Sequence, residues 1–205
     1  MIPVDRVPEP PHFDREARVP GNDWLAANPN AKTAKFPDHW SRFRKDLAAG
    51  FNDLCGYSAI FTKPGTVDHY ICKSSRQGRP LTYEWSNYRF ASSLMNERKG
   101  TWNARILDPH EIGHGWFEIL LPHHEMVLVE ERIPLERRDD AAFTLKTLRL
   151  RDDVEILDVR RHWYEEFTSG RNTLEGLAQH APLIARAVKK RLDEINMAAL
   201  DDARI

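Results

Sequence analysis

Hydrophobic spacing divides the chain into a helical beginning, a β-rich centre and a helical end. Within residues 37–49, large apolar side chains recur three or four positions apart, which predicts a helix that Gly50 ends. The recurring side chains are Trp40, Phe43 and Leu47. Residues 1–36 are rich in Pro, Asn and Gly, so we expect mostly an extended arm there, with one helical turn at 24–27.

The centre of the chain predicts a strand, a loop, a short strand and a helix. Residues 66–71 alternate between polar and apolar and favour β structure, which indicates a strand. After a polar loop, residues 81–85 form a second strand or an irregular return. Ser86 or Asn87 is then expected to cap a helix that continues to about Lys99, where a glycine follows.

The last 90 or so residues predict a β-hairpin followed by helices. Two strand-like runs, 115–121 and 126–131, are separated by a proline and two histidines and predict the hairpin. Helices are expected at 139–150 and 153–168, and another begins near Thr173 and restarts at Pro182. The positions expected to face inward are Ala142, Leu145, Leu148, Leu150, Ile156, Val159, Trp163, Phe167, Leu183, Ile184, Ala187, Val188, Arg191, Leu192 and Ile195. The whole pattern predicts an α+β fold.

Composition identifies a globular chain. Of 205 residues, 41% are hydrophobic and 30% charged, which excludes a disordered polymer. No stretch approaches the roughly 18 apolar residues of a membrane span. The first residues contain acids and prolines and lack the apolar segment of a secretory signal. With Cys55 and Cys72 as the only cysteines, we expect a reduced, cytoplasmic protein.

Charge is balanced overall but not along the chain. The net charge of −1 excludes a generally basic nucleic-acid-binding coat. Residues 63–105 hold eight basic and three acidic side chains, so this segment carries +5 and the remainder −6. Such a segment forms either a local phosphate-binding patch or an ordinary solvated charged face.

Residue types suited to phosphodiester hydrolysis gather in the same segment. That reaction needs a base for the attacking water and stabilisation of charge on the phosphoryl and leaving oxygens. Neutral His69 is a candidate base, and the oxygens of Asp68 and Asn96 are hard ligands for a divalent ion. Because neighbours on a strand point to opposite sides, Asp68 and His69 can serve one site only if the strand ends or twists there. Asn87 would tie the intervening loop to the strand and so position His69.

Basic side chains nearby are candidates for binding phosphate. Lys99 and Arg98 follow Asn96 within one helical turn, and Arg89 and Lys73 lie in the same basic segment. We expect these four to hold the nucleic-acid backbone.

With these residues in this order and spacing, the sequence resembles the HNH family of endonucleases, the ββα-metal nucleases. The matching residues are Asp68, His69, Asn87 and Asn96, with Lys99 at a position where the family often has lysine. The resemblance implies that His69 is the general base, that Asp68 and Asn96 bind one divalent ion, and that Asn87 orients the base. It covers residues 51–105, about a quarter of the chain.

The resemblance implies four segments that form one compact unit. These are an arm and helix at 1–50, the nuclease core at 51–105, a β-hairpin extension at 106–135 and a helical region at 136–205. The run from Leu81 to Gly100 also resembles smaller bacterial HNH proteins found beside an ATPase in anti-phage systems such as Septu.

The sequence departs from the family at the structural zinc that braces many HNH motifs. The two Cys-x-x-Cys pairs would fall on Cys55 and Ser58 and on Ser92 and Met95, so a site of four thiolates is impossible. Packing must then replace the brace, and the candidates are Tyr57, Tyr83, Trp85, Phe90 and Met95.

The sequence therefore predicts a DNA endonuclease that uses one divalent ion, Mg²⁺ or else Mn²⁺, and works with a partner protein such as an ATPase. Its DNA substrate is duplex or single-stranded. Two alternatives stay open: a non-catalytic nucleic-acid-binding or regulatory subunit that keeps the scaffold, and an HNH nuclease that cleaves RNA. A Cys72–His69 thiol pair and metal binding by the histidines at 110–124 are weaker alternatives.

Overall fold

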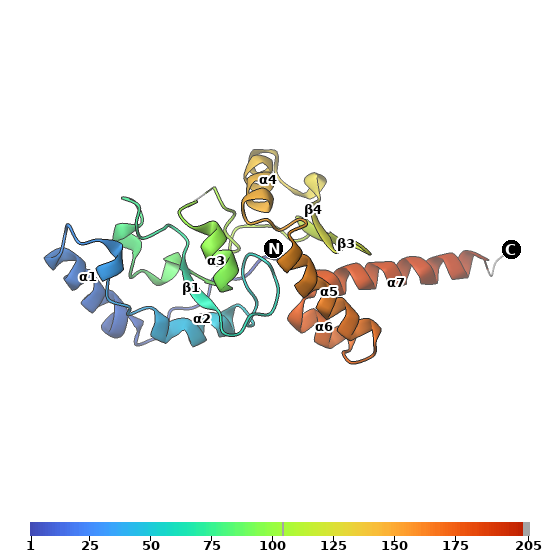
Figure 1. Cartoon of the computed structure of the whole chain (residues 1–205), viewed down its shortest axis with the longest axis horizontal. Helices are drawn as coiled ribbons and strands as arrows, with labels where there is room; N and C mark the ends of the chain where they lie inside the picture. Colours follow the sequence, from blue (N-terminus) through green and yellow to red (C-terminus); the bar gives the residue numbers. More distant parts are fainter. Residues whose placement is uncertain (104, 203–205) are drawn as a thin grey trace.

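The computed structural model describes residues 1–103 and 105–202, and over these residues the fold is mixed α+β and mostly helical. The described part contains seven α-helices and two antiparallel β-hairpins, which confirms the expected fold class. Figure 1 shows an elongated molecule. Helices α1 and α2 and strand β1 lie towards one end, and α5, α6 and α7 lie towards the other.

The N-terminal segment is more helical than the sequence predicted. A π-helical turn at Asp14–Arg18 leads directly into α1, Val19–Ala27, so an extended arm is wrong for these residues. The predicted helix at 37–49 is shorter than expected, because α2 spans only Arg44–Gly50 after a 3₁₀ turn at Ser41–Phe43. Its periodic side chains nevertheless lie in the core as predicted: Trp40, Phe43 and Leu47.

The centre forms a hairpin followed by a helix. Strand β1, Thr66–His69, pairs antiparallel with β2, Tyr88–Ala91, and α3, Ser93–Lys99, follows at once. The second strand and the helix start were predicted wrongly, at 81–85 and at Ser86 or Asn87. Ser92 is the true cap, because its side chain accepts a hydrogen bond from the backbone N–H of Met95. Gly100, with φ of +50°, ends α3 as expected.

The hairpin lies between two hydrophobic clusters. Val67, Tyr88 and Phe90 belong to an aromatic cluster that also holds side chains from α2 and the N-terminal segment. Ala91 and Met95 belong to a second cluster formed largely by the C-terminal half. Because side chains alternate along a strand, one face of the hairpin meets each cluster.

The C-terminal half follows the predicted order. Strands β3, Phe117–Leu120, and β4, Glu125–Leu128, form the expected hairpin. The expected helices are also present, as α4, Arg138–Thr147, α5, Val154–Thr168, α6, Leu174–His180, and α7, Pro182–Asp202. Over the described residues, none of the helices is both long enough and apolar enough to cross a membrane.

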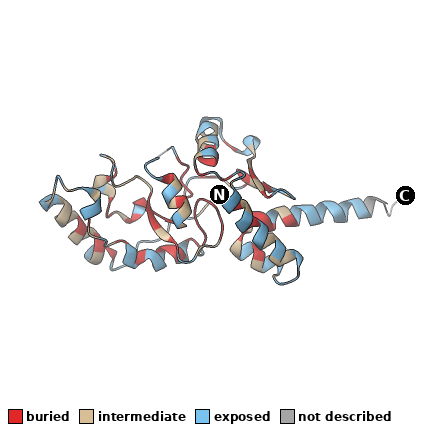
Figure 2. Cartoon of the chain, viewed as in Figure 1, coloured by how far each residue is buried: buried red, intermediate tan, exposed pale blue. Residues whose placement is uncertain are grey.

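Some predicted inward positions of these helices are exposed. Ala142 and Val159 face solvent, while their neighbours Ala141 and Arg160 are buried. The Arg160 guanidinium donates hydrogen bonds to three backbone carbonyls, which compensates for its burial. On α7, Leu192 and Ile195 are 43% and 50% exposed, because the second half of this helix extends beyond the body (Figure 2).

Candidate active site

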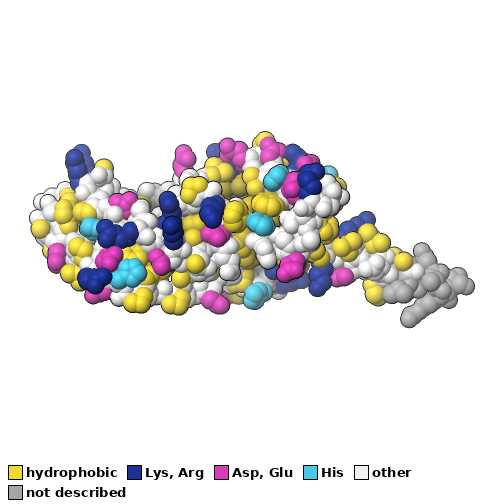
Figure 3. All heavy atoms as spheres, turned by 90° about the horizontal axis from the view of Figure 1, so that it is seen from below, with side chains coloured by type: hydrophobic (Ala, Val, Ile, Leu, Met, Phe, Trp, Pro, Cys, Tyr) yellow, Lys and Arg dark blue, Asp and Glu magenta, His cyan; other side chains and the backbone are white. Residues whose placement is uncertain are grey.

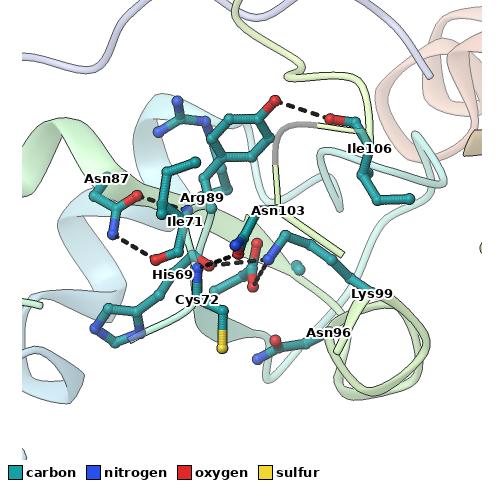
Figure 4. A network of polar contacts seen from close by, with 12 residues as sticks. His69, Ile71, Cys72, Asn87, Arg89, Asn96, Lys99, Asn103 and Ile106 are labelled. Carbon is teal, nitrogen blue, oxygen red and sulfur yellow. Dashed lines mark hydrogen bonds and ion pairs between the residues drawn. The ribbon is translucent and has the colours of Figure 1, made fainter. Parts of the chain in front are cut away.

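Asp68 lies on the face of β1 that α3 covers, and both of its carboxylate oxygens are occupied. Tyr57 Oη donates a hydrogen bond to Oδ2 over 2.5 Å, and Lys99 Nζ donates one to Oδ1 over 2.9 Å. The same ammonium group donates to the backbone oxygen of His69 over 2.9 Å. Lys99 is 0% exposed and Asp68 is 2% exposed, so this is a buried ion pair (Figure 4).

Asn96 of α3 contacts β1 at Thr66, on the same strand as Asp68. Its side-chain N–H donates to Thr66 Oγ1 over 3.1 Å. Thr66 and Asp68 are two residues apart on β1 and share a face. The Asn96 amide therefore meets this face one side-chain position along the strand from the Asp68 carboxylate. Asp68 and Lys99 therefore pair between β1 and α3, and Asn96 contacts the same face of β1 at Thr66.

His69 points to the opposite face of β1, into the aromatic cluster. Its ring meets Trp40 and Tyr88 edge-on, with centroids 4.8 and 5.1 Å away, and the residue is 7% exposed. His69 Nε2 lies 3.0 Å from the carbonyl oxygen of Thr82. Since a carbonyl only accepts hydrogen bonds, Nε2 carries the hydrogen and Nδ1 has the free lone pair.

Burial keeps His69 neutral. Desolvation, together with the positive charges of Lys73 and Lys99, lowers the pKa of His69 to about 3, and the hydrogen bond to Thr82 opposes this shift. The imidazole is therefore unprotonated near neutral pH. β1 ends at His69, as a shared site requires, but the ring still points away from Asp68 across the strand.

Asn87 ties together the two chain segments that flank the hairpin. Its Oδ1 accepts a hydrogen bond from Ile71 N over 2.8 Å. Its Nδ2 donates to the carbonyl oxygens of Ile71 and Leu81 over 3.0 and 3.1 Å. Because Leu81 precedes Thr82, Asn87 also fixes the segment whose carbonyl holds His69. Figure 4 shows Asn87 facing Ile71.

The four basic residues expected at phosphate have different surroundings. Arg89 is 3% exposed and makes a bidentate ion pair with Asp108, in which Nε and Nη2 lie 2.6 and 2.5 Å from the two carboxylate oxygens. The expectation that Arg89 and Lys99 bind phosphate therefore does not agree with their burial. Arg98 pairs with carboxylates of the loop before α5 and of α5 itself. Lys73 Nζ lies 3.9 Å from the centre of the Trp40 ring, and within the part of the chain described it pairs with no carboxylate.

Burial also affects the neighbouring ionisable groups. Desolvation by itself raises the pKa of Asp108, but the hydrogen bonds and charge of Arg89 hold it below its ordinary value. Burial, with Asp68 nearby, raises the pKa of Tyr57 well above its ordinary value, so the phenol keeps its proton and remains a donor. Burial lowers the pKa of Lys73.

Lys and Arg side chains do not form one electropositive area on the face drawn in Figure 3. Lys and Arg side chains lie there among Asp and Glu side chains. Arg89 and Lys99 contribute to the +5 of residues 63–105 but are buried in ion pairs, so they add no charge to the surface.

Sequence reasoning missed several partners in the site because they come from loops. Thr82 and Asp108 have no pattern that predicts their contacts, and Tyr57 was expected only to pack. Asn103 Oδ1 accepts a hydrogen bond from Cys72 N over 2.7 Å and so holds the loop after β1. In that loop Gly78 is required, since a Cβ atom there would lie 2.0 Å from the Cys72 carbonyl oxygen.

The bracing residues proposed in place of zinc are all buried: Tyr57, Tyr83, Trp85, Phe90 and Met95. Cys55 and Cys72 are both free thiols. The described residues contain no group of three or more His, Cys, Asp or Glu side chains that could hold a metal ion. This includes the histidines at 110–124.

The donor set at Asp68 suits a hard cation. Two oxygens, Asp68 Oδ1 and His69 O, converge on one position, and the positively charged Nζ of Lys99 fills it. A carboxylate oxygen and a carbonyl oxygen are among the donors that Mg²⁺ and Mn²⁺ prefer. The residues therefore fit a divalent ion in charge and donor type, with Lys99 as the present stand-in.

Neither the protein-family models nor the curated proteins contain a match to this sequence.

Proposed function

We propose that the chain is an HNH-type endonuclease that hydrolyses DNA with the help of one divalent ion. The observation that carries the proposal is the β1–β2 hairpin followed by α3, which puts Asp68 and Asn96 on facing elements. The order strand, strand, helix supports the proposal, because a ββα-metal finger is built in this order. Asp68 and Asn96 would hold the ion, which would neutralise charge on the phosphoryl and leaving oxygens.

His69 is proposed to accept the proton of the attacking water at Nδ1. Thr82 supports this role, because its carbonyl fixes the tautomer and leaves Nδ1 unprotonated. A pKa of about 3 makes the isolated imidazole a weak base. A negatively charged phosphate bound beside it would raise that pKa and strengthen the base. Asn87 positions the segment that contains Thr82.

Lys73 is the basic side chain best placed to meet phosphate. It is half-buried beside His69, and its charge already acts on the imidazole. Arg98 would contribute only if it left its carboxylate partners. We propose a cytoplasmic protein that acts with a partner such as an ATPase in anti-phage defence, the role suggested by the resemblance to Septu-type proteins.

A second candidate is a non-catalytic nucleic-acid-binding or regulatory subunit. The burial of the site favours this candidate, because the Lys99 ammonium group pairs with the Asp68 carboxylate and His69 is only 7% exposed. RNA as substrate remains a variant of the leading proposal, since the residues described do not distinguish the two sugars.

A nuclease assay tests the proposal. Purified chain is incubated with plasmid, single-stranded DNA and RNA, with and without Mg²⁺ or Mn²⁺. His69→Ala should lower the cleavage rate by about 10² to 10⁴, the usual contribution of a general base, when compared with the wild type at equal amounts of folded chain as measured by circular dichroism. His162→Ala, which removes an exposed histidine from α5, is the matched control and should cleave as the wild type does. Wild-type cleavage by His69→Ala would refute the assignment, and a folded chain inert with its partner on every substrate would favour the binding subunit.

A further inference from the structure

Lys99 is an unusual lysine. Lysine is almost never fully buried without a partner, and here the entire side chain is 0% exposed. Over the described residues, its ammonium group has two hydrogen-bond partners, Asp68 Oδ1 and the carbonyl oxygen of His69. These are the oxygens of the proposed metal position. Figure 4 shows the side chain reaching from α3 to β1.

We propose that Lys99 and a divalent ion compete for the Asp68 carboxylate, so that Lys99 sets the metal affinity of the site. The inference rests on the metal site of the proposed function. Two cations within a few ångströms of each other repel strongly in a buried site. The ammonium and the ion therefore bind Asp68 one at a time.

The surroundings allow the exchange. The Asp68 carboxylate keeps its orientation when Lys99 leaves, because Tyr57 holds the other oxygen. Lys99 is the last residue of α3, and the exposed residues Gly100 and Thr101 follow it. A rotation of its flexible four-carbon stem at this end of the helix brings the ammonium to solvent. Lys99 is thus a positioning residue that acts through Asp68.

Mn²⁺ titration of the full chain by calorimetry tests the competition. Lys99→Met keeps the volume and removes the charge, and it should bind Mn²⁺ with a Kd about tenfold or more lower than the wild type. Lys45→Met makes the same change on the exposed surface of α2 and should leave the Kd within about twofold. Asp68→Asn in the Lys99→Met background should abolish the binding. A purely structural role for Lys99 would weaken metal binding on substitution, so a Kd that is unchanged or higher overturns the proposal.

Amine labelling of the wild-type chain gives a second measurement that needs no variant. Without metal, buried Lys99 should react slowly with an acetylating reagent, as mass spectrometry of its peptide would show. Saturating Mn²⁺ should raise its labelling several-fold, while labelling of exposed Lys45 stays constant. Unchanged labelling of Lys99 at saturation overturns the proposal, as does the absence of Mn²⁺ binding in both proteins.

The outcomes separate this inference from the proposed function. If Lys99→Met tightens Mn²⁺ binding and Lys99 becomes labelled, but no nucleic acid is cleaved even with the partner present, the competition stands and the nuclease proposal fails. If His69→Ala abolishes cleavage while Lys99 behaves alike with and without metal, the nuclease proposal stands and the competition fails.

Discussion

The two faces of β1 bury an ionisable residue each, by opposite means. On the face towards α3, Asp68 meets an ammonium group and a phenol. On the other face, His69 meets two aromatic rings and one carbonyl oxygen. The first environment neutralises the carboxylate charge of Asp68 with an ammonium group. The second keeps the imidazole of His69 uncharged, since burial lowers the pKa of His69 to about 3.

This difference follows from strand geometry. Consecutive side chains on a strand point to opposite faces, so neighbours in sequence enter separate environments. A site that uses both side chains has to be reached at the end of the strand, and β1 ends at His69. The loop after it is held by Asn87 and Asn103. The proposed site would therefore be reached from this loop and from the end of α3.

Removal of the charged partner on the Asp68 face should have the largest effect on stability. Lys99→Met leaves a buried carboxylate with Tyr57 as its remaining partner, and we expect a loss of about 3–5 kcal/mol in the free energy of unfolding. Lys45→Met should change it by no more than about 0.5 kcal/mol. Urea denaturation followed by circular dichroism measures both. A loss below about 1 kcal/mol for Lys99→Met would mean that the ion pair contributes little.

The burial of His69 should make the free energy of unfolding depend on pH. The pKa of His69 is about 3 in the folded chain and about 6.5 in the unfolded chain, so between these values the unfolded chain binds the extra proton. Stability contributed by neutral His69 is present above pH 6.5 and is lost as the pH falls towards 3. At pH 5 the loss should be about 2 kcal/mol relative to pH 7.

Comparison with His69→Gln isolates this contribution, because His39, His110 and His124 also have lowered pKa values. Glutamine keeps a donor for the Thr82 carbonyl and does not titrate. Urea denaturation at pH 7 and pH 5 should show a smaller loss for the variant, by about 2 kcal/mol. If both proteins lost the same free energy of unfolding between pH 7 and pH 5, the environment of His69 would be more polar than the structure shows.

Periodic spacing predicted most of the fold where one face of an element is buried. The hairpin of β3 and β4 and the helices α4 to α7 appear in their predicted places. The N-terminal helix was missed because Pro20 and Gly21 are typical of a loop. Pro20 is tolerated in the first turn of α1. Gly21 packs on Tyr83, where a Cβ atom would lie 2.3 Å from the ring, and no local pattern reveals such a contact.

The same limit applies to the site. Residue types and spacing placed Asp68 on a strand and Asn96 late in the helix after the hairpin, and the structure has both there, with Asn96 in contact with Thr66 of β1. They did not predict that Lys99 is buried, because a lysine in the last turn of a helix is usually solvated and favourable there. Its burial depends on Asp68 and Tyr57, which the fold brings from other segments.

The smallest expected effect concerns Lys73, whose charge acts on the His69 imidazole but which takes no part in the hydrogen bond between that ring and Thr82. Its charge is the second cause of the low pKa of His69, after burial. Lys73→Met should therefore raise that pKa from about 3 by about one pH unit or less, since burial persists. Nuclear magnetic resonance of the imidazole ring, titrated towards acid, follows the change, with Lys45→Met as the control. A pKa that stays the same or falls would show that the charge of Lys73 is screened from His69 by solvent.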